Sequence, residues 1–244
     1  MPARRRGIGR FGLAATAIPA LLAAVCLVGQ PTPILAPPGP TIPGVDVSHY
    51  QRTIDWPAVF ADGYRFAYIK ASEGRGLLDP TYRRNARQAR AAGLAVGAYH
   101  FARPDDTSGD ALAEANAFLR LAHPASGDLA PMLDLETAGP LDAADLQVWV
   151  RAWLGHVAAA TGVRPMIYAG STFWRAHMAD TLGLATYPLM WAAAQPGSTI
   201  PAKGWAALGW TGWQWSTCGT VDGVDGCVDL DVLRRDQVRL LRIP

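Results

Sequence analysis

The chain has 244 residues, of which 50% are hydrophobic and 17% are charged, with nine Trp, seven Tyr and six Phe. This composition excludes a disulfide-stapled mini-protein and a wholly disordered chain, and it is sufficient for a large buried core. The formal net charge of +2 includes four arginines within the first ten residues. Without these four arginines, 18 of the 22 basic residues and all 20 acidic residues remain, which gives a net charge near −2. We therefore expect no basic surface for nucleic acid.

The N-terminal segment has the order of an export signal. Residues 2–10 are rich in arginine, and residues 11–29 are uncharged and mostly apolar. A run of this length is also sufficient for an N-terminal membrane anchor. We expect residues 1–30 to be a signal peptide or anchor, residues 31–42 to be a proline-rich linker, and residues 43–244 to form the folded domain. The protein is accordingly predicted to be exported, to the cell envelope or beyond, with membrane contact only through its N-terminal segment.

Eight short runs rich in β-branched and aromatic residues predict buried strands. These strands are expected at residues 44–50, 66–71, 95–101, 130–136, 164–170, 188–194, 212–216 and 228–233. The first five alternate with helical segments, most clearly at residues 81–93, where Asp79 and Pro80 precede the run and Gly93 ends it. A longer helix carries a core stripe, formed by Leu146, Val150, Trp153 and Val157.

The pattern changes after residue 170. A short helix is expected at residues 172–179, and the loops that follow are too irregular for full helices. We therefore predict an α/β fold, a modified TIM-like barrel of parallel strands with five complete β/α units and three further strands, in a single catalytic domain. In such barrels the active site lies at the carboxyl ends of the strands.

Four carboxylates occur where buried strands are expected to be apolar: Asp46, Asp134, Glu136 and Asp229. Asp134 and Glu136 are two apart and so share one face of a strand, while barrel closure makes the strands of Asp46 and Asp229 neighbours. Crowded carboxylates repel each other, which keeps one of them protonated, as glycosidic cleavage requires. We assign Glu136 as the acid because it has the longer reach and ends its strand.

Other interpretations of these acids carry less weight. A single acid at a strand end is usually a helix cap or a surface ion pair, but several in strand-like contexts are not. Calcium or magnesium also binds oxygen clusters, yet the Asp-rich loop spacing of a dedicated calcium site is missing. We predict no metal and no cofactor.

Further candidates come from the aromatic residues and the cysteines. Tyr99, Tyr168 and Trp191 lie in strand segments that approach the catalytic end, where they would stack against sugar rings. Core packing is an equally good interpretation of each one. Cys218 and Cys227 are only nine positions apart in the sequence, and in an oxidising compartment we expect them to form a disulfide.

The motifs together resemble glycoside hydrolase family 25, the N-acetylmuramidase lysozymes. The motifs are GVDVSHYQ from residue 44, FAYIKASEG from residue 66, AYHF from residue 98, DLE at 134–136, IYAG around Tyr168, WQW around Gln214 and the closing VDLD. The resemblance covers nearly the whole expected domain. It implies cleavage of the β-1,4 bond between N-acetylmuramic acid and N-acetylglucosamine in peptidoglycan.

Within this resemblance, Glu136 is the expected proton donor and Asp134 orients the substrate acetamido group or stabilises charge. Asp46 and Asp229 complete the acidic floor, and Gln214 joins the substrate-binding residues. Lys70 and Glu73 are expected to form a supporting ion pair. The family usually has Asn where this chain has Asp231, so Asp231 either shifts the pH optimum or faces solvent.

Two alternatives stay open at this stage. One is a noncatalytic glycan-binding barrel, which the presence of both DLE acids disfavours. The other is a chitinase-like glycosidase, whose longer aspartate-rich strand signature is missing. In either case the expected partner is a glycan strand, and we expect a monomer.

Overall fold

A closed barrel of eight strands forms the centre of the domain. The computed structural model describes residues 39–192 and 203–244. The strands follow the order β1-β9-β8-β7-β6-β5-β4-β2, and pairing of β1 with β2 closes the ring. Their bounds are β1 Thr41–Val47, β2 Phe66–Glu73, β4 Ala95–Phe101, β5 Met132–Asp134, β6 Met166–Gly170, β7 Leu189–Ala192, β8 Gly212–Gly219 and β9 Val228–Arg234. The two-residue strand β3 (Leu77–Leu78) extends β2 as a hairpin. The expected leader, residues 1–30, lies outside the described residues. Strand β1 begins at Thr41, so it includes the last two residues of the expected linker.

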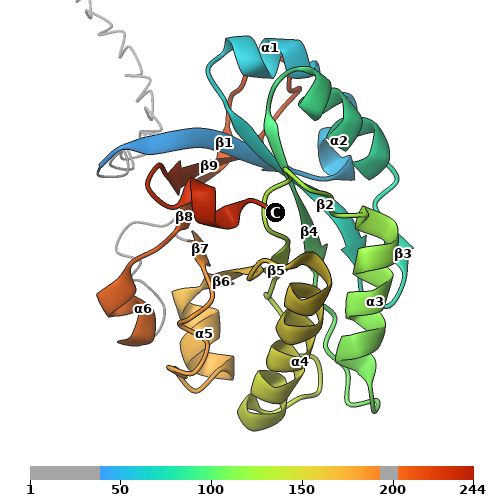
Figure 1. Cartoon of the computed structure of the whole chain (residues 1–244), viewed down its shortest axis with the longest axis vertical. Helices are drawn as coiled ribbons and strands as arrows, with labels where there is room; N and C mark the ends of the chain where they lie inside the picture. The colour runs from blue at the N-terminus through green and yellow to red at the C-terminus, as the bar shows by residue number, and fades with distance from the viewer. Residues whose placement is uncertain (1–38, 193–202) are drawn as a thin grey trace, which may run out of the picture. The chain divides into compact units, whose positions relative to one another are not determined.

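Helices lie outside the ring of strands (Figure 1). Their bounds are α1 Trp56–Ala61, α2 Tyr82–Ala91, α3 Asp110–Ala122, α4 Ala143–Thr161, α5 Ser171–His177 and α6 Lys203–Leu208, with the 3-10 turns η1 His49–Gln51 and η2 Val238–Leu241. Five β/α units followed by three strands confirm the predicted fold class. The six-residue helix α6, in the connection between β7 and β8, was not predicted. Within the described ranges, none of the helices is long and apolar enough to cross a membrane.

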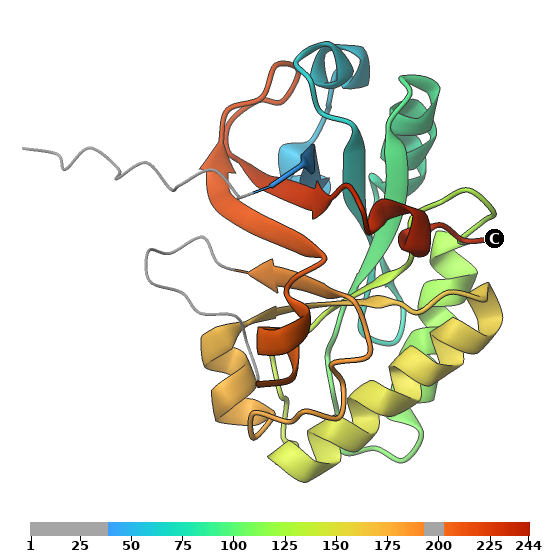
Figure 2. The same ribbon diagram turned by 60° about the vertical axis from the view of Figure 1, so that its left-hand side comes forward.

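Strand β9 corrects the expectation of a wholly parallel barrel. It runs antiparallel to both of its neighbours, β8 and β1, and Figure 2 shows it beside β8. Only residues 220–227 connect β8 to β9, whereas a parallel connection needs about a dozen residues or more. The reversed direction matters for the site, because Asp229 at the start of β9 thereby pairs with Asp46 near the end of β1.

Large side chains fill the lower part of the barrel. Phe66 and Tyr68 of β2 are fully buried there. A Cβ at Gly44 would lie 2.3 Å from the Phe66 ring, and one at Gly97 would lie 2.3 Å from the Tyr68 ring. Glycine is therefore required at both positions for the aromatic rings to enter. The interior is a packed core at this level and becomes a cavity only towards the carboxyl ends of the strands.

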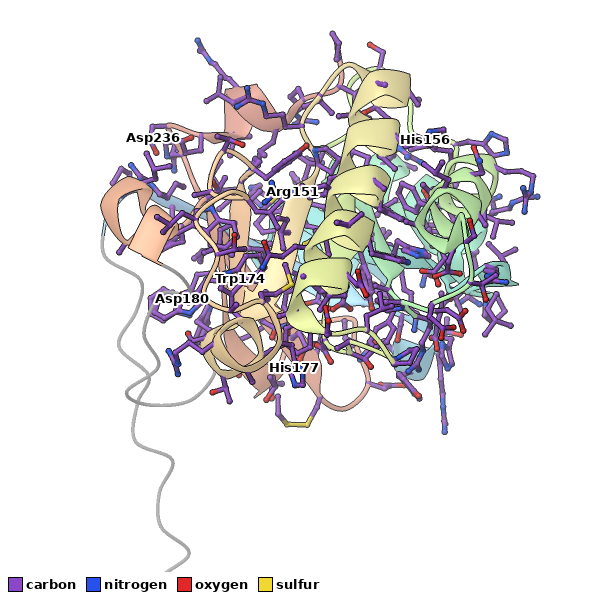
Figure 3. All side chains as sticks on the ribbon, turned by 90° about the horizontal axis from the view of Figure 1, so that it is seen from below. Arg151, His156, Trp174, His177, Asp180 and Asp236 are labelled. Carbon is purple, nitrogen blue, oxygen red and sulfur yellow. A yellow bond between two sulfur atoms is a disulfide. The ribbon has the colours of Figure 1, made fainter. Side chains whose placement is uncertain are left out.

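A second apolar layer lies between the strands and the helices. The predicted stripe of α4 is entirely buried in it: Leu146, Val150, Trp153 and Val157. Arg151 and His156 lie on either side of α4 (Figure 3), and Arg151 donates a hydrogen bond to the Gly183 carbonyl at 2.8 Å. His156 contacts Asn116 of α3 at 2.8 Å, which joins the two helices.

Candidate active site

A cavity of about 210 Å³ lies at the carboxyl ends of the parallel strands. Its lining comes from almost every strand of the barrel: Asp46, Val47, Ser48, Tyr50, Gln51, Lys70, Tyr99, Phe101, Met132, Asp134, Glu136, Tyr168, Gln214 and Asp229. All four predicted carboxylates are among them, although the chain separates the first from the last by more than 180 residues. The structure thus brings these four groups together at one mouth of the barrel.

Strand alternation explains why the DLE sequence faces the cavity. Met132 and Asp134 of β5 point into the barrel, while Leu133 and Leu135 are buried in the outer apolar layer. Glu136 continues the inward series just after β5 ends. Asp134 is 8% exposed at the floor of the cavity, whereas Glu136 is exposed at its mouth.

The deeper carboxyls hold their protons strongly. Burial raises the pKa of Asp134 well above its usual range, and the nearby charges of Glu136 and Asp46 raise it further, against the opposing charge of Lys70. Burial likewise raises the pKa of Asp46, and the charge of Asp229 adds to the effect. The hydrogen bond from Gln214 opposes this increase. These two groups therefore stay protonated to a higher pH than an isolated aspartate does.

The outer carboxyls are shifted in the same direction. Burial raises the pKa of Glu136, while the Tyr168 hydroxyl and the charge of Lys70 lower it. The Glu136 side chain is solvent-exposed as a whole, so this burial reflects the protein that surrounds its carboxyl group in the cavity. Burial also raises the pKa of Asp229 to about 6. All four carboxyls of the cluster thus hold their protons to a higher pH than isolated carboxyls do.

Gln214 connects two strands of the site across the barrel. Its Oε1 accepts a hydrogen bond from the Tyr168 hydroxyl at 2.8 Å, and its Nε2 donates to Asp46 Oδ2 at 2.7 Å. Gln214 is only 4% exposed, so this bridge is shielded from water. It fixes the orientation of the Asp46 carboxyl and of the Tyr168 ring. Tyr99, also buried, completes this wall of the cavity.

Trp191 is the predicted site residue that the structure does not bring to the cavity. Alternation along β7 turns Met190 into the barrel and Trp191 into the outer layer. There its ring stacks on Trp213, with centroids 5.0 Å apart. The expectation that Trp191 stacks against a sugar is therefore replaced by a role in core packing.

Lys70 has a more central position than the sequence indicated. Its Nζ lies 2.6 Å from Glu73 Oε2, which confirms the predicted ion pair. Lys70 also lines the cavity and lies 4.8 Å from the centre of the Phe101 ring. The signal was present in the sequence, because Lys70 continues the inward series of Phe66 and Tyr68 at intervals of two.

The predicted disulfide between Cys218 and Cys227 is present, as the yellow bond in Figure 3 shows. It closes the loop between β8 and β9, two residues before Asp229. Gln51 of η1 donates a hydrogen bond to the Cys227 carbonyl at 3.2 Å and accepts one from the Ser48 amide at 3.0 Å. These contacts join the loop to the turn that borders the cavity.

Asp231 does not face solvent, so the structure excludes one of the two alternatives left by the sequence. It is 1% exposed and lies inside the barrel. Burial raises its pKa well above the usual range, and the charges of Asp46 and Asp229 add to this effect.

The fold and the cavity define a class of enzyme. A modified β/α barrel with clustered carboxyls of raised pKa at its catalytic mouth is suited to glycoside hydrolysis, which needs a protonated acid next to ionised groups. Among the described residues, no group of three or more His, Cys, Asp and Glu side chains is arranged to hold a metal ion. The chain is a glycoside hydrolase.

The family is shown by comparison with known proteins. The model of glycosyl hydrolases family 25 matches residues 45–224, and the chain belongs to this family of lysozymes. It is 38% identical over 204 residues to the uncharacterized protein YegX of Escherichia coli (strain K12), covering 82% of this chain and 72% of that one. Lysozyme M1 of Streptomyces globisporus is 34% identical over 211 residues, covering 83% and 71%. The crystal structure of the bacterial lysozyme from Streptomyces coelicolor matches with a TM-score of 0.75 at 32% identity, covering 83% and 96%.

Proposed function

We propose that this protein hydrolyses peptidoglycan by cleaving the β-1,4 bond between N-acetylmuramic acid and N-acetylglucosamine. The observation that carries the proposal is the convergence of four carboxyls on one open cavity, with one of them exposed at its mouth. Membership of family 25 and the similarity to a lysozyme from Streptomyces globisporus support the choice of glycan.

Glu136 is the proposed general acid. A general acid must come within about 2.6–3.2 Å of the departing oxygen and must hold a proton at the working pH. Glu136 is the most exposed of the four carboxyls, so a glycan strand reaches it without entering the barrel. Its raised pKa lets it hold a proton to a higher pH than an ordinary glutamate does. As the glycosidic C–O bond breaks, the Glu136 proton passes to the leaving oxygen, and water supplies the hydroxyl group that the anomeric carbon gains.

The deeper residues are proposed to hold the sugar during this step. Asp134, on the floor of the cavity, orients the acetamido group or stabilises the positive charge that develops at the anomeric carbon. Asp46 and Asp229 add negative potential below the sugar ring. Tyr99 and Tyr168 offer ring surfaces and hydroxyls along the wall, and Gln214 holds Tyr168 in place.

The proposed place of action is outside the cytoplasm. The disulfide between Cys218 and Cys227 suits an oxidising compartment, and the residues before the linker have the order of an export signal. The glycan strands of a cell wall are accessible there.

The test is digestion of purified peptidoglycan by the full chain, with mass analysis of the sugar that carries the new reducing end. Glu136→Gln should keep the fold and the affinity for glycan but lose about 10²–10⁴-fold in rate, because a general acid is removed. Asp106→Asn is a suitable control, because Asp106 is an exposed carboxylate outside the cavity.

The outcomes separate the alternatives. New reducing muramic acid together with an inactive Glu136→Gln variant supports the proposal. New reducing glucosamine means that a different bond is cleaved. Retained glycan binding without any cleavage by the wild-type chain would indicate a noncatalytic binding barrel, and full activity in Glu136→Gln would reject the assigned acid.

A further inference from the structure

Asp231 lies one step deeper in the barrel than the carboxyls of the proposed active site. It is two residues after Asp229 on β9, so both side chains point inward. Its register partners are Gly44 of β1, which has no side chain, and Gln214 of β8. Asp231 is 1% exposed, and neither of its carboxyl oxygens has a hydrogen-bond partner within the described parts of the chain.

The surroundings of Asp231 do not suit an ionised carboxylate. The charged groups that act on it are Asp46 of β1 and Asp229 of its own strand, both of which are negative when ionised. Tyr68 of β2 also faces it, and Arg242 in turn acts on Tyr68. The Tyr68 hydroxyl, however, already donates to the Ala130 carbonyl at 3.1 Å. A buried carboxylate without donors is far more costly than a neutral carboxyl group.

Protonation lowers the free-energy cost of burying Asp231 and also gives its side chain a hydrogen-bond donor. A neutral carboxyl has one O–H donor, which needs an acceptor. Asp46 is the carboxyl that interacts with Asp231 most strongly, and its Oδ2 already accepts a hydrogen bond from Gln214. A second hydrogen bond, donated by the deeper Asp231, would fix the orientation of the Asp46 carboxyl together with the one from Gln214.

We propose that Asp231 works as a neutral carboxylic acid, a positioning residue that donates a hydrogen bond to Asp46 beneath the catalytic cavity. The proposal rests on the proposed function, since it gives Asp46 its working orientation for glycan cleavage. It assigns to this chain an acid that contributes no charge to the site.

Two variants test the donor and the charge separately. Asp231→Asn keeps a neutral donor of the same shape, whereas Asp231→Leu has a similar size without a donor. We expect Asp231→Asn to keep the wild-type kcat and pH profile on purified peptidoglycan. Asp231→Leu should lose about tenfold to a hundredfold in kcat with little change in KM, because the buried acceptor on Asp46 then lacks its donor.

The opposite outcomes overturn the proposal. If Asp231 were ionised in the working enzyme, Asp231→Asn would remove a negative charge and shift the pH profile towards acid by about one pH unit or more. Wild-type kcat in Asp231→Leu would show that no donor is needed at this position.

A measurement that needs no activity separates this proposal from the proposed function. Carboxyl ¹³C NMR of the wild-type chain gives a signal that is missing in Asp231→Asn. We expect this signal to stay at its protonated position at pH values where an ordinary aspartate is already ionised. Titration at the ordinary value would overturn the proposal even if Asp231→Leu did not fold, whereas an active Glu136→Gln would contradict only the proposed function.

Discussion

Replacement of Asp229 by Asn should stabilise the folded protein while it damages the site. Burial raises the pKa of Asp229 from its ordinary value of 3.8 to about 6, with the charge of Glu136 adding to the effect and the hydrogen bond with Asp46 opposing it. The unfolded chain therefore ionises at lower pH than the folded one. The protonated Asp229 carboxyl is therefore more favourable in the folded state than its ionised form. Its contribution to the free energy of unfolding is complete below about pH 4 and is lost as the pH rises through about 6.

The size of the effect follows from the pKa difference. Each pKa unit corresponds to 1.36 kcal/mol of free energy. The rise from 3.8 to about 6 would therefore lower the free energy of unfolding by about 3 kcal/mol above pH 6 if the group were fully buried. Asp229 is only partly buried, and screening by solvent reduces this to about 1–2 kcal/mol. Asn has no charge at any pH. The Asp229→Asn variant should thus gain this free energy of unfolding at pH 8 but not at pH 4.

Urea unfolding, followed by the fluorescence of the nine tryptophans, measures this difference at the two pH values. Asp106→Asn serves as the control, because it makes the same chemical change at an exposed position outside the cavity. The reasoning is refuted if Asp229→Asn is no more stabilising at pH 8 than at pH 4, or if the control shows the same pattern.

Two further predictions concern the groups that hold the site in place. Gln214→Leu removes the donor to Asp46 and the acceptor of the Tyr168 hydroxyl, and kcat should fall about tenfold or more; an unchanged kcat on peptidoglycan would show that the bridge is dispensable. Replacing Cys218 and Cys227 by Ser should lower the free energy of unfolding by about 2–3 kcal/mol, since their loop is short. Urea unfolding measures this loss, and equal stability with and without the disulfide would contradict the prediction.

Much of the barrel was readable in the sequence because its strands and helices have strong local signals. The stripe of α4 was identified residue by residue, and all four residues are buried. The acids Asp134 and Glu136 stood out because charge is unfavourable within an apolar strand pattern. Barrel closure then placed Asp46 opposite Asp229, which the register confirms.

The remaining features depend on geometry that local patterns do not encode. Strand β9 has the same apolar pattern in either direction, and only the length of its connection to β8 distinguishes the two. Trp191 and Met190 are adjacent apolar residues, so the sequence did not show which of them faces the barrel interior. Asp231 was left with two interpretations because its burial depends on the small neighbour Gly44, which belongs to the other end of the chain.

The same crowding that costs stability provides the chemistry of the site. Asp46, Asp134, Glu136 and Asp229 all have raised pKa values, mainly through burial, and most of them raise one another. Protons lost from such a cluster belong to the group of carboxyls rather than to one residue. Glu136 raises the pKa of the three other acids, whereas its own pKa is raised by burial of its carboxyl group, against the opposing effects of the Tyr168 hydroxyl and the charge of Lys70.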